Sequence, residues 1–455
     1  MEKNEHPKRN LPEAFTERLN VDLENEAPEL IKALSDESPV SIRYNPAKQS
    51  KTIDLEKVPW CETGYYLPER PVFTLDPLFH AGVYYVQEAS SMFLEEILRQ
   101  NIDLSKALKV LDLCGAPGGK STHLASLISS DSLLVANEVI RPRAKILAEN
   151  LTKWGYPNVV VTNNDPADFQ RLPGFFDLLV IDAPCSGEGM FRKDPRAIEE
   201  WSEANVQHCS VRQRRIVADA WSCLKEGGLL VYSTCTFNRI ENDENLQWII
   251  RECKGEPVFS DLKRFPEIMP AGNLPGYRFY PHRVKGEGFF LSLFRKNQKH
   301  DSGQIKPGKK SLQKCDKSIR SNVQEWLKEK MSFEFFRFND QVLAFPGPQV
   351  NDLIAIIGRM SIVQAGTEMA EVKARNLIPA QALAFSICLE KERFPSIELD
   401  RSEALRFLRK EDIRPPGNEP FLRASFENTP LGFLKRAGNR YNNLYPKEWR
   451  IRMDE

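Results

Sequence analysis

The fold class of this chain can be predicted from one segment, Val110-Leu111-Asp112-Leu113-Cys114-Gly115-Ala116-Pro117-Gly118-Gly119-Lys120-Ser121. It starts as a continuous apolar run, passes through a glycine-rich turn and ends in residues that can open a helix. Strands that are buried in a parallel sheet have continuous apolar sequences of this kind, and a glycine-rich turn that leads into a helix is typical of a doubly wound α/β sheet. Two further apolar runs, 178–181 and 229–232, each end just before a cysteine-containing turn.

Apolar runs alternate with helical stretches from about residue 80 to residue 297. This alternation predicts a doubly wound sheet, whose ligands bind beyond the carboxyl ends of the strands. The expected strands are 109–113, 132–137, 158–162, 178–182, 228–233 and 289–294, and the expected helices are 86–99, 119–129, 141–154, 206–225 and 241–253.

The glycine-rich loop could serve a phosphate or a nucleoside. A Walker A loop has four residues between its first glycine and the Gly-Lys pair, whereas Gly115 and Gly119 are separated by three. The spacing therefore argues against a nucleotide triphosphatase. A nucleoside cofactor would instead need a carboxylate after the second strand for its ribose, which Glu138 supplies, and a polar group after the third for its base, which Asp165 supplies.

Two of the nine cysteines stand apart from the others. Most cysteines are buried apolar residues, but Cys185 and Cys235 both follow strands that end at the expected ligand crevice. This placement indicates thiol chemistry on a bound substrate.

Three motifs together carry a resemblance to a known family. They are Asp112 to Ser121, Asp182-Ala183-Pro184-Cys185-Ser186-Gly187 and Ser233-Thr234-Cys235-Thr236. In combination they resemble the NSUN/RsmF family of S-adenosylmethionine-dependent RNA cytosine-5 methyltransferases. The segment around Arg43 and Asn45 and the segment from Gly438 to Pro446 resemble the bacterial RsmF branch of this family more weakly.

The resemblance implies a Rossmann-like methyltransferase domain, S-adenosylmethionine as cofactor and small-subunit (16S) ribosomal RNA, or the 30S subunit, as partner. A transfer RNA substrate and a non-catalytic RNA-binding or ribosome-assembly role on the same scaffold remain alternatives. No metal is expected. The implied cofactor residues are Cys114, Gly115, Ala116, Pro117, Gly118, Gly119, Lys120, Glu138, Arg143, Asp165 and Asp182, and the implied catalytic residues are Cys235, Cys185, Asp182 and Lys193.

The chemistry independently explains these residue types. Carbon 5 of cytosine is a poor nucleophile until a thiolate adds to carbon 6 and converts the ring to an enamine. A protonated Asp182 bonded to ring nitrogen 3 would stabilise the charge that develops. The residues alone leave open which thiol attacks; the resemblance implies that Cys235 attacks and Cys185 assists release.

The flanking segments are expected to hold RNA. We expect a small α+β domain over 1–75, the catalytic domain over 76–297, a linker over 298–318, a small α+β module over 319–390 and a PUA-like domain over 391–455. Basic residues alternate with Tyr441, Tyr445 and Trp449 near the C-terminus, a mixture that suits phosphate and base contact. The basic linker residues 306–310 could add attraction that is independent of RNA sequence.

Bulk composition is neutral about an RNA partner, because 63 basic residues balance 63 acidic ones. The cysteines show no CxxC pair, which argues against a disulfide framework and a structural zinc site. No apolar run reaches the length of a membrane span, and the charged N-terminus lacks a signal-peptide core. We therefore expect a cytoplasmic protein without a membrane partner, and a monomer.

Overall fold

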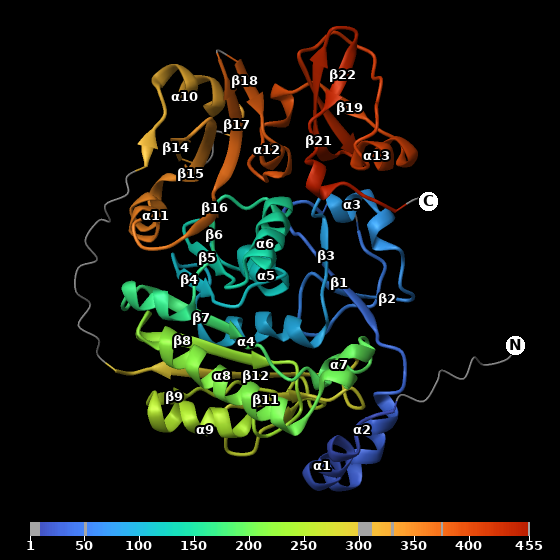
Figure 1. The fold of residues 1–455 in the computed structure, drawn as a ribbon, viewed down its shortest axis with the longest axis vertical. Helices are drawn as coiled ribbons and strands as arrows, with labels where there is room; N and C mark the ends of the chain where they lie inside the picture. The colour runs from blue at the N-terminus through green and yellow to red at the C-terminus, as the bar shows by residue number, and fades with distance from the viewer. Residues whose placement is uncertain (1–9, 50–51, 299–311, 329–331, 375, 454–455) are drawn as a thin grey trace, which may run out of the picture.

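The computed structural model describes residues 10–49, 52–298, 312–328, 332–374 and 376–453. Its centre is a large mixed sheet, with the C-terminal elements on one side and the N-terminal helices α1 and α2 at the opposite end (Figure 1). The linker residues 306–310 lie outside the described residues. Among those described, no helix is both long and apolar enough to span a bilayer.

The central sheet has the strand order β10-β11-β12-β8-β7-β4-β5-β6-β16, and β9 pairs with β12. Strands β8, β7, β4, β5 and β6 are parallel, as the continuous apolar runs predict, whereas β12 and β16 are antiparallel to their neighbours. The strands are β4 (Lys109–Asp112), β5 (Leu133–Asn137), β6 (Val159–Thr162), β7 (Phe176–Asp182), β8 (Leu224–Thr234), β9 (Gly255–Pro257), β10 (Met269–Pro270), β11 (Gly276–Phe279), β12 (Phe289–Lys296) and β16 (Ile362–Ala365).

Helices cover both faces of this sheet, and its two apolar cores lie between the sheet and these helices. The helix α6 coincides with its expected range, because Pro142 suits a first helical turn and Gly155 ends the helix. The helices of this region are α3 (Pro77–His80), α4 (Leu94–Asn101), α5 (Gly119–Leu127), α6 (Arg141–Trp154), α7 (Pro195–Glu200), α8 (Glu203–Trp221) and α9 (Asp243–Glu252).

Two expected helices differ from the structure. The helix expected over 86–99 begins only at Leu94, because the Glu88 carboxylate accepts the backbone N–H groups of Ser90 and Ser91 and fixes a tight turn there. The helix expected over 206–225 begins earlier, where the Ser202 side chain caps α8 by accepting the N–H of Asn205.

The N-terminal segment contains α1 (Glu13–Leu23), α2 (Ala27–Ala33) and an antiparallel sheet of β1 (Val40–Tyr44), β2 (Gly64–Leu67) and β3 (Tyr84–Val86). Since β3 pairs with β1, this sheet extends past the boundary expected at residue 75. The buried Arg43 joins it to the catalytic part, because its guanidinium donates to Gln87 and Thr122 and lies over the Trp154 ring.

The C-terminal part holds two further sheets, β13-β14-β15-β17-β18 and β19-β20-β21-β22. The expected end of the linker at residue 318 falls inside α10, and the division of the chain into five parts stays a prediction. The elements are β13 (Gln313–Lys314), α10 (Lys317–Gln324), β14 (Phe333–Phe338), β15 (Gln341–Pro346), α11 (Val350–Ile357), β17 (Thr367–Lys373), β18 (Asn376–Pro379), α12 (Gln381–Phe385), β19 (Ser396–Glu398), α13 (Arg401–Leu408), β20 (Phe421–Phe426), β21 (Thr429–Ala437) and β22 (Arg440–Asn443).

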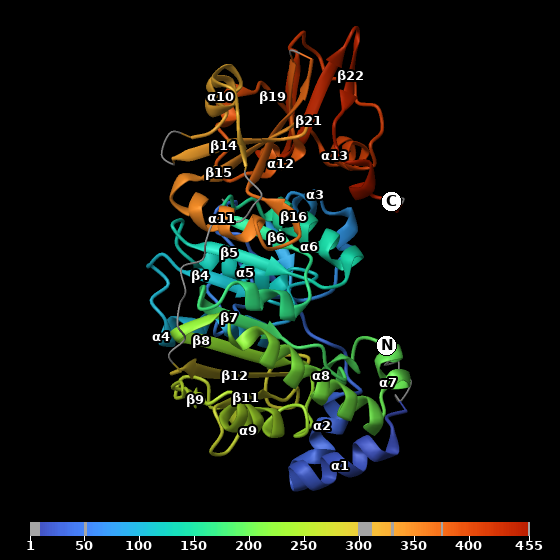
Figure 2. The ribbon, with the colours of Figure 1, turned by 60° about the vertical axis from the view of Figure 1, so that its left-hand side comes forward.

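The C-terminal part completes the central sheet. Strand β16 pairs antiparallel with β6, and Figure 2 shows the two side by side. The preceding helix α11 buries Leu353 and Ile356 in the same core as strands β4 and β5. The sequence pattern alone cannot predict this contribution, because strands β13, β14 and β15 of another sheet lie between β12 and β16 in the chain.

We expect Gly155→Ala to destabilise the protein through this junction. Gly155 has φ +87°, and a Cβ there would lie 2.0 Å from the Phe385 carbonyl oxygen. The left-handed backbone and the clash together should cost about 3 kcal/mol or more of unfolding free energy. Gly227 is the matched control: it has φ +75° but nothing within 4 Å of its added Cβ, so Gly227→Ala should cost only about 1 kcal/mol. Equal losses in chemical denaturation would contradict the junction argument.

Candidate active site

The two cysteines singled out from the sequence lie together. Cys185 follows β7 and Cys235 follows β8, and these neighbouring parallel strands end at the same edge of the sheet. Their sulfur atoms are 3.0 Å apart, and the backbone N–H of Cys235 lies 3.3 Å from the Cys185 sulfur.

The surroundings of Cys185 favour its protonated form. The neighbouring Cys235 sulfur and burial raise the pKa of the Cys185 thiol well above its usual range. Cys185 therefore keeps its proton and can donate a hydrogen bond to the Cys235 sulfur.

Asp182 occupies the last position of β7 and both of its oxygens accept hydrogen bonds. Its Oδ1 accepts from the Ser233 hydroxyl at 2.8 Å, and its Oδ2 pairs with Lys120 Nζ, also at 2.8 Å. Lys120 lies over the Phe289 ring as well. The lysine that resembles a phosphate-binding group is thus held by a carboxylate beside the cysteines.

The glycine-rich loop between β4 and α5 is held from the neighbouring strand and helix. Gly115 N–H donates to the Asn137 carbonyl at 2.8 Å, and Arg143 donates to the Ala116 carbonyl at 2.9 Å. Asn150 donates to the Pro117 carbonyl. A Cβ on Gly115 would lie 2.7 Å from the Ser121 hydroxyl, so this close approach requires glycine.

The loop is surrounded by carboxylates, which fit a cationic nucleoside cofactor and oppose a phosphate. Asp112 is fully buried; its Oδ2 accepts from Ser121, and its Oδ1 has no hydrogen-bond partner among the described residues. Glu138 is buried too and lies 3.5 Å from Arg143. The sulfonium and ammonium charges of S-adenosylmethionine would complement carboxylates at such a loop.

Two predicted site residues have other partners. Asp165 caps the short helical turn at Pro166–Arg171, where it accepts the Ala167 N–H, and it lies 3.6 Å from Arg215. Lys193 pairs with Glu287 at 3.2 Å and lines a cavity of about 820 Å³ with Arg192, Lys285 and residues 37–40. Cys114, in the glycine-rich loop, has a pKa raised by burial.

Comparison with known families decides the identity. The profile described as "16S rRNA methyltransferase RsmB/F" matches residues 100–295. The "N-terminal domain of 16S rRNA methyltransferase RsmF" matches 11–89, and the "Methyltransferase RsmF PUA domain" matches 394–451. Ribosomal RNA small subunit methyltransferase F of Aliivibrio fischeri is 32% identical over 96% of this chain and 97% of its own length. The chain belongs to the RsmF family.

Other relatives agree. The Vibrio cholerae protein of the same name is 31% identical over 97% of this chain and 98% of its own. A solved methyltransferase homolog from Pyrococcus horikoshii has a TM-score of 0.55 and 28% identity, covering 63% of this chain and 96% of that one. NSun6 from the same organism, at 20% identity and a TM-score of 0.56 over 64% and 100% of the two chains, shares the fold.

Family membership confirms the main predictions from the sequence. The protein has a Rossmann-like methyltransferase fold with a C-terminal PUA domain, it is an S-adenosylmethionine-dependent methyltransferase, and its substrate is RNA. The roles of individual residues stay predictions.

The prediction for the C-terminal aromatic residues is wrong in part. Tyr445 is fully buried against Phe407 and Trp449, and Tyr441 is 6% exposed, so these rings form the core of the PUA domain and cannot stack on bases. The exposed basic residues of the same segment are Arg436, Arg440, Lys447, Arg450 and Arg452.

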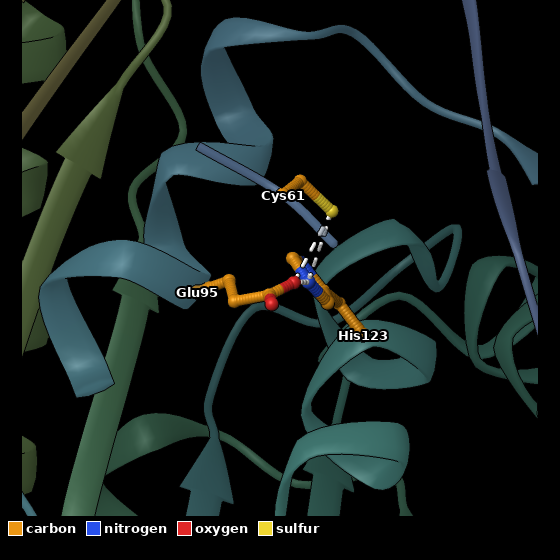
Figure 3. Close-up of side chains that lie close together, drawn as sticks. All are labelled: Cys61, Glu95 and His123. Carbon is orange, nitrogen blue, oxygen red and sulfur yellow. Dashed lines mark hydrogen bonds and ion pairs between the residues drawn. The ribbon is translucent and has the colours of Figure 1, made fainter. Parts of the chain in front are cut away.

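A second buried cluster joins Cys61, Glu95 and His123 (Figure 3). His123 Nε2 lies 3.0 Å from Glu95 Oε2, and the Cys61 thiol donates to the same oxygen at 3.2 Å. Burial lowers the pKa of His123 to about 4, so its ring is neutral. A metal-bound histidine normally donates its other N–H to an acceptor, but His123 Nδ1 has none among the described residues. These contacts are better explained as hydrogen bonds that connect three elements of the fold than as the ligands of a metal ion.

Sequence reasoning missed several buried polar residues at the site. Asp112 and Ser233 are named only as members of motifs, and Glu188 and Glu241 are not among the predicted site residues. Glu188 directly follows the Cys185 motif, and Glu241 follows the Cys235 motif by five residues. A carboxylate inside an otherwise small and apolar turn, such as Glu188 in Gly187-Glu188-Gly189, is the signal that could have found them.

Proposed function

We propose that this protein methylates carbon 5 of a cytosine in small-subunit (16S) ribosomal RNA, using Cys235 as nucleophile and Cys185 to assist release. The contact of 3.0 Å between the two sulfur atoms, beside the Asp182–Lys120 pair, is the observation that carries the proposal. The naming of the relatives as small-subunit ribosomal RNA methyltransferases supports the choice of RNA. We further propose that it acts in the cytoplasm as a monomer, on ribosomal RNA or the 30S subunit.

The first step joins the base to the protein. The Cys235 thiolate adds to carbon 6 of the cytosine, a sulfur–carbon bond forms, and the electron pair of the C5–C6 double bond makes carbon 5 nucleophilic. Lys120 places a proton donor beside Asp182, so that Asp182 can present a proton to ring nitrogen 3 as negative charge develops. Lys193 is proposed to reach the base or the RNA backbone from the cavity that it lines with Arg192 and Lys285.

The cofactor residues are proposed to hold S-adenosylmethionine, which when bound supplies an electrophilic methyl group. The loop from Cys114 to Lys120 provides close backbone approach, and Arg143 fixes its shape. Glu138 would accept the ribose hydroxyls and Asp165 would contact the base, provided that Asp165 leaves its capping role.

The last step frees the product. With the methyl group on carbon 5, the proton on that carbon passes to water and the C5–H electron pair re-forms the C5–C6 double bond. The bond from carbon 6 to sulfur breaks, and its electrons return to Cys235. Cys185 is placed to assist, because its sulfur already contacts the leaving sulfur.

Bisulfite mapping of a strain that lacks the gene tests the substrate. We expect the loss of 5-methylcytosine from 16S ribosomal RNA and unchanged transfer RNA. Loss confined to transfer RNA would overturn the proposed substrate, and unchanged modification in both would overturn the proposed activity.

Cofactor affinity should depend on pH through Asp112. Burial raises the pKa of this carboxyl to about 7, so it is mostly protonated at pH 6 and mostly ionised at pH 8. Because a cationic ligand favours the ionised form, S-adenosylmethionine should bind about tenfold more tightly at pH 8 than at pH 6. Calorimetric titration measures this, and Asp112→Asn should remove most of the pH dependence. Equal affinity at both pH values in the unaltered protein would contradict the assignment.

A further inference from the structure

Glu188 ties the turn of one active-site cysteine to the turn of the other. It follows Cys185 by three residues and is fully buried. Its Oε2 accepts the backbone N–H groups of Phe237 and Asn238, at 2.9 and 3.1 Å, which follow Cys235 by two and three residues. The next residue, Gly189, donates its N–H to the Cys235 carbonyl at 2.9 Å.

Glu241 makes the reciprocal connection. It follows Cys235 in the chain, and its carboxylate accepts the N–H of Ser186, next to Cys185, at 3.1 Å. Gln213 donates to it at 2.6 Å. The Asn238 amide bridges the two carboxylates, at 2.8 Å from Glu241 and 3.2 Å from Glu188. We call Glu188 and Glu241 the carboxylate clasp.

A buried carboxylate keeps its charge at a low cost in free energy only when hydrogen bonds or a nearby cation compensate that charge. For Glu188 the cation comes from far away in the sequence: Arg18 Nη1 lies 2.8 Å from Glu188 Oε1. The Arg18 guanidinium lies 5.3 Å from the centre of the Phe15 ring and 5.6 Å from that of Trp201. Trp201 also donates its indole N–H to Glu188.

Arg18 belongs to α1, which lies with α2 at one end of the molecule in both views (Figures 1 and 2). Phe15 and Leu19 of α1 share an apolar core with Phe237, two residues after Cys235. The N-terminal helix is therefore packed and ionically tied to the turn that carries Cys235.

We propose that α1 positions the catalytic residues: through Arg18 and the carboxylate clasp, it determines the distance between the two thiols. Arg18, Glu188 and Glu241 are positioning residues, and the inference rests on the proposed roles of Cys235 and Cys185. Attack on carbon 6 needs Cys235 alone, whereas release needs both sulfur atoms at a fixed separation. A looser clasp should therefore slow release more than attack.

Arg18→Gln tests this in the full-length protein with 16S ribosomal RNA and S-adenosylmethionine. We expect kcat to fall about 10- to 100-fold, as for a small misplacement of reacting groups. The fraction of protein covalently bound to RNA at steady state should rise several-fold, and S-adenosylmethionine affinity should stay within about twofold. Arg18→Lys, which keeps the charge, should recover part of kcat. A kcat within twofold of the unaltered protein, or a fall without adduct accumulation, overturns the proposal.

Glu26→Gln is the matched control. Glu26 also ties the N-terminal segment to the catalytic part, through Arg283 and His282, but it does not contact the clasp. It should leave the adduct fraction unchanged. If Arg18→Gln does not fold, Glu188→Gln removes the same ion pair with the side-chain size kept, and the same outcomes apply. Cys185→Ala is measured in parallel: if it also fails to trap RNA, the proposed thiol roles are wrong, whereas trapping only by Cys185→Ala refutes the role of α1 alone.

Discussion

Cys235→Ala should abolish methyl transfer and form no adduct, whereas Cys185→Ala should trap a covalent protein–RNA complex. Without the Cys235 sulfur, carbon 5 is never activated, and we expect turnover to fall by at least about 10⁴-fold, as when other catalytic nucleophiles are removed. Without Cys185, attack and methylation proceed but the leaving sulfur lacks its partner at 3.0 Å. Denaturing gel electrophoresis with labelled RNA separates the two outcomes.

Cys253→Ala is the control for this pair, because Cys253 is buried at the end of α9, in the core on one face of the sheet. It should behave like the unaltered protein. Trapping by Cys235→Ala, with none by Cys185→Ala, would reverse the roles of the two thiols.

Asp182→Ala has the second largest expected effect. It removes the partner of Lys120 and of the Ser233 hydroxyl, and with them the group proposed to bond ring nitrogen 3. Loss of one such stabilising group in a transition state typically costs about 10²- to 10³-fold in kcat. We expect that fall in single-turnover methyl transfer, with S-adenosylmethionine affinity reduced less than tenfold.

Asp177→Ala is its matched control, on the same strand but at the opposite end, where Asp177 pairs with Lys225. This variant should change stability slightly and leave kcat unchanged. If Asp182→Ala retained more than a tenth of the activity, Asp182 would have no essential role in the chemistry.

The central strands could be predicted because they are buried on both faces and therefore form continuous apolar runs. The predicted start of the helix over 86–99 was wrong because the Glu88 side chain accepts the backbone N–H groups of residues 90 and 91. These groups were expected to take part in helical hydrogen bonds. Strand β16 was missed because its burial depends on pairing with β6, which lies far away in the chain.

The candidate site, too, could be predicted only where neighbouring sequence determines it. The motifs identified Cys185, Cys235, Asp182 and Lys120, because their strands end at one edge of one sheet. They could not identify Arg18, whose role depends on a contact with Glu188 from a separate helix. The mixture of basic and aromatic residues near the C-terminus gave a wrong prediction for Tyr445, because composition does not distinguish a ring in a small core from one that faces RNA.

The pairing of β16 with β6 has a consequence for biosynthesis. A ribosome releases β6 (Val159–Thr162) long before β16 (Ile362–Ala365), and until then the nascent sheet has an open edge that can recruit other strands. Strand β6 is paired on both sides only after translation has passed residue 365, so a prematurely terminated chain would carry Cys185 and Cys235 on a sheet whose β6 edge is unpaired and prone to aggregation.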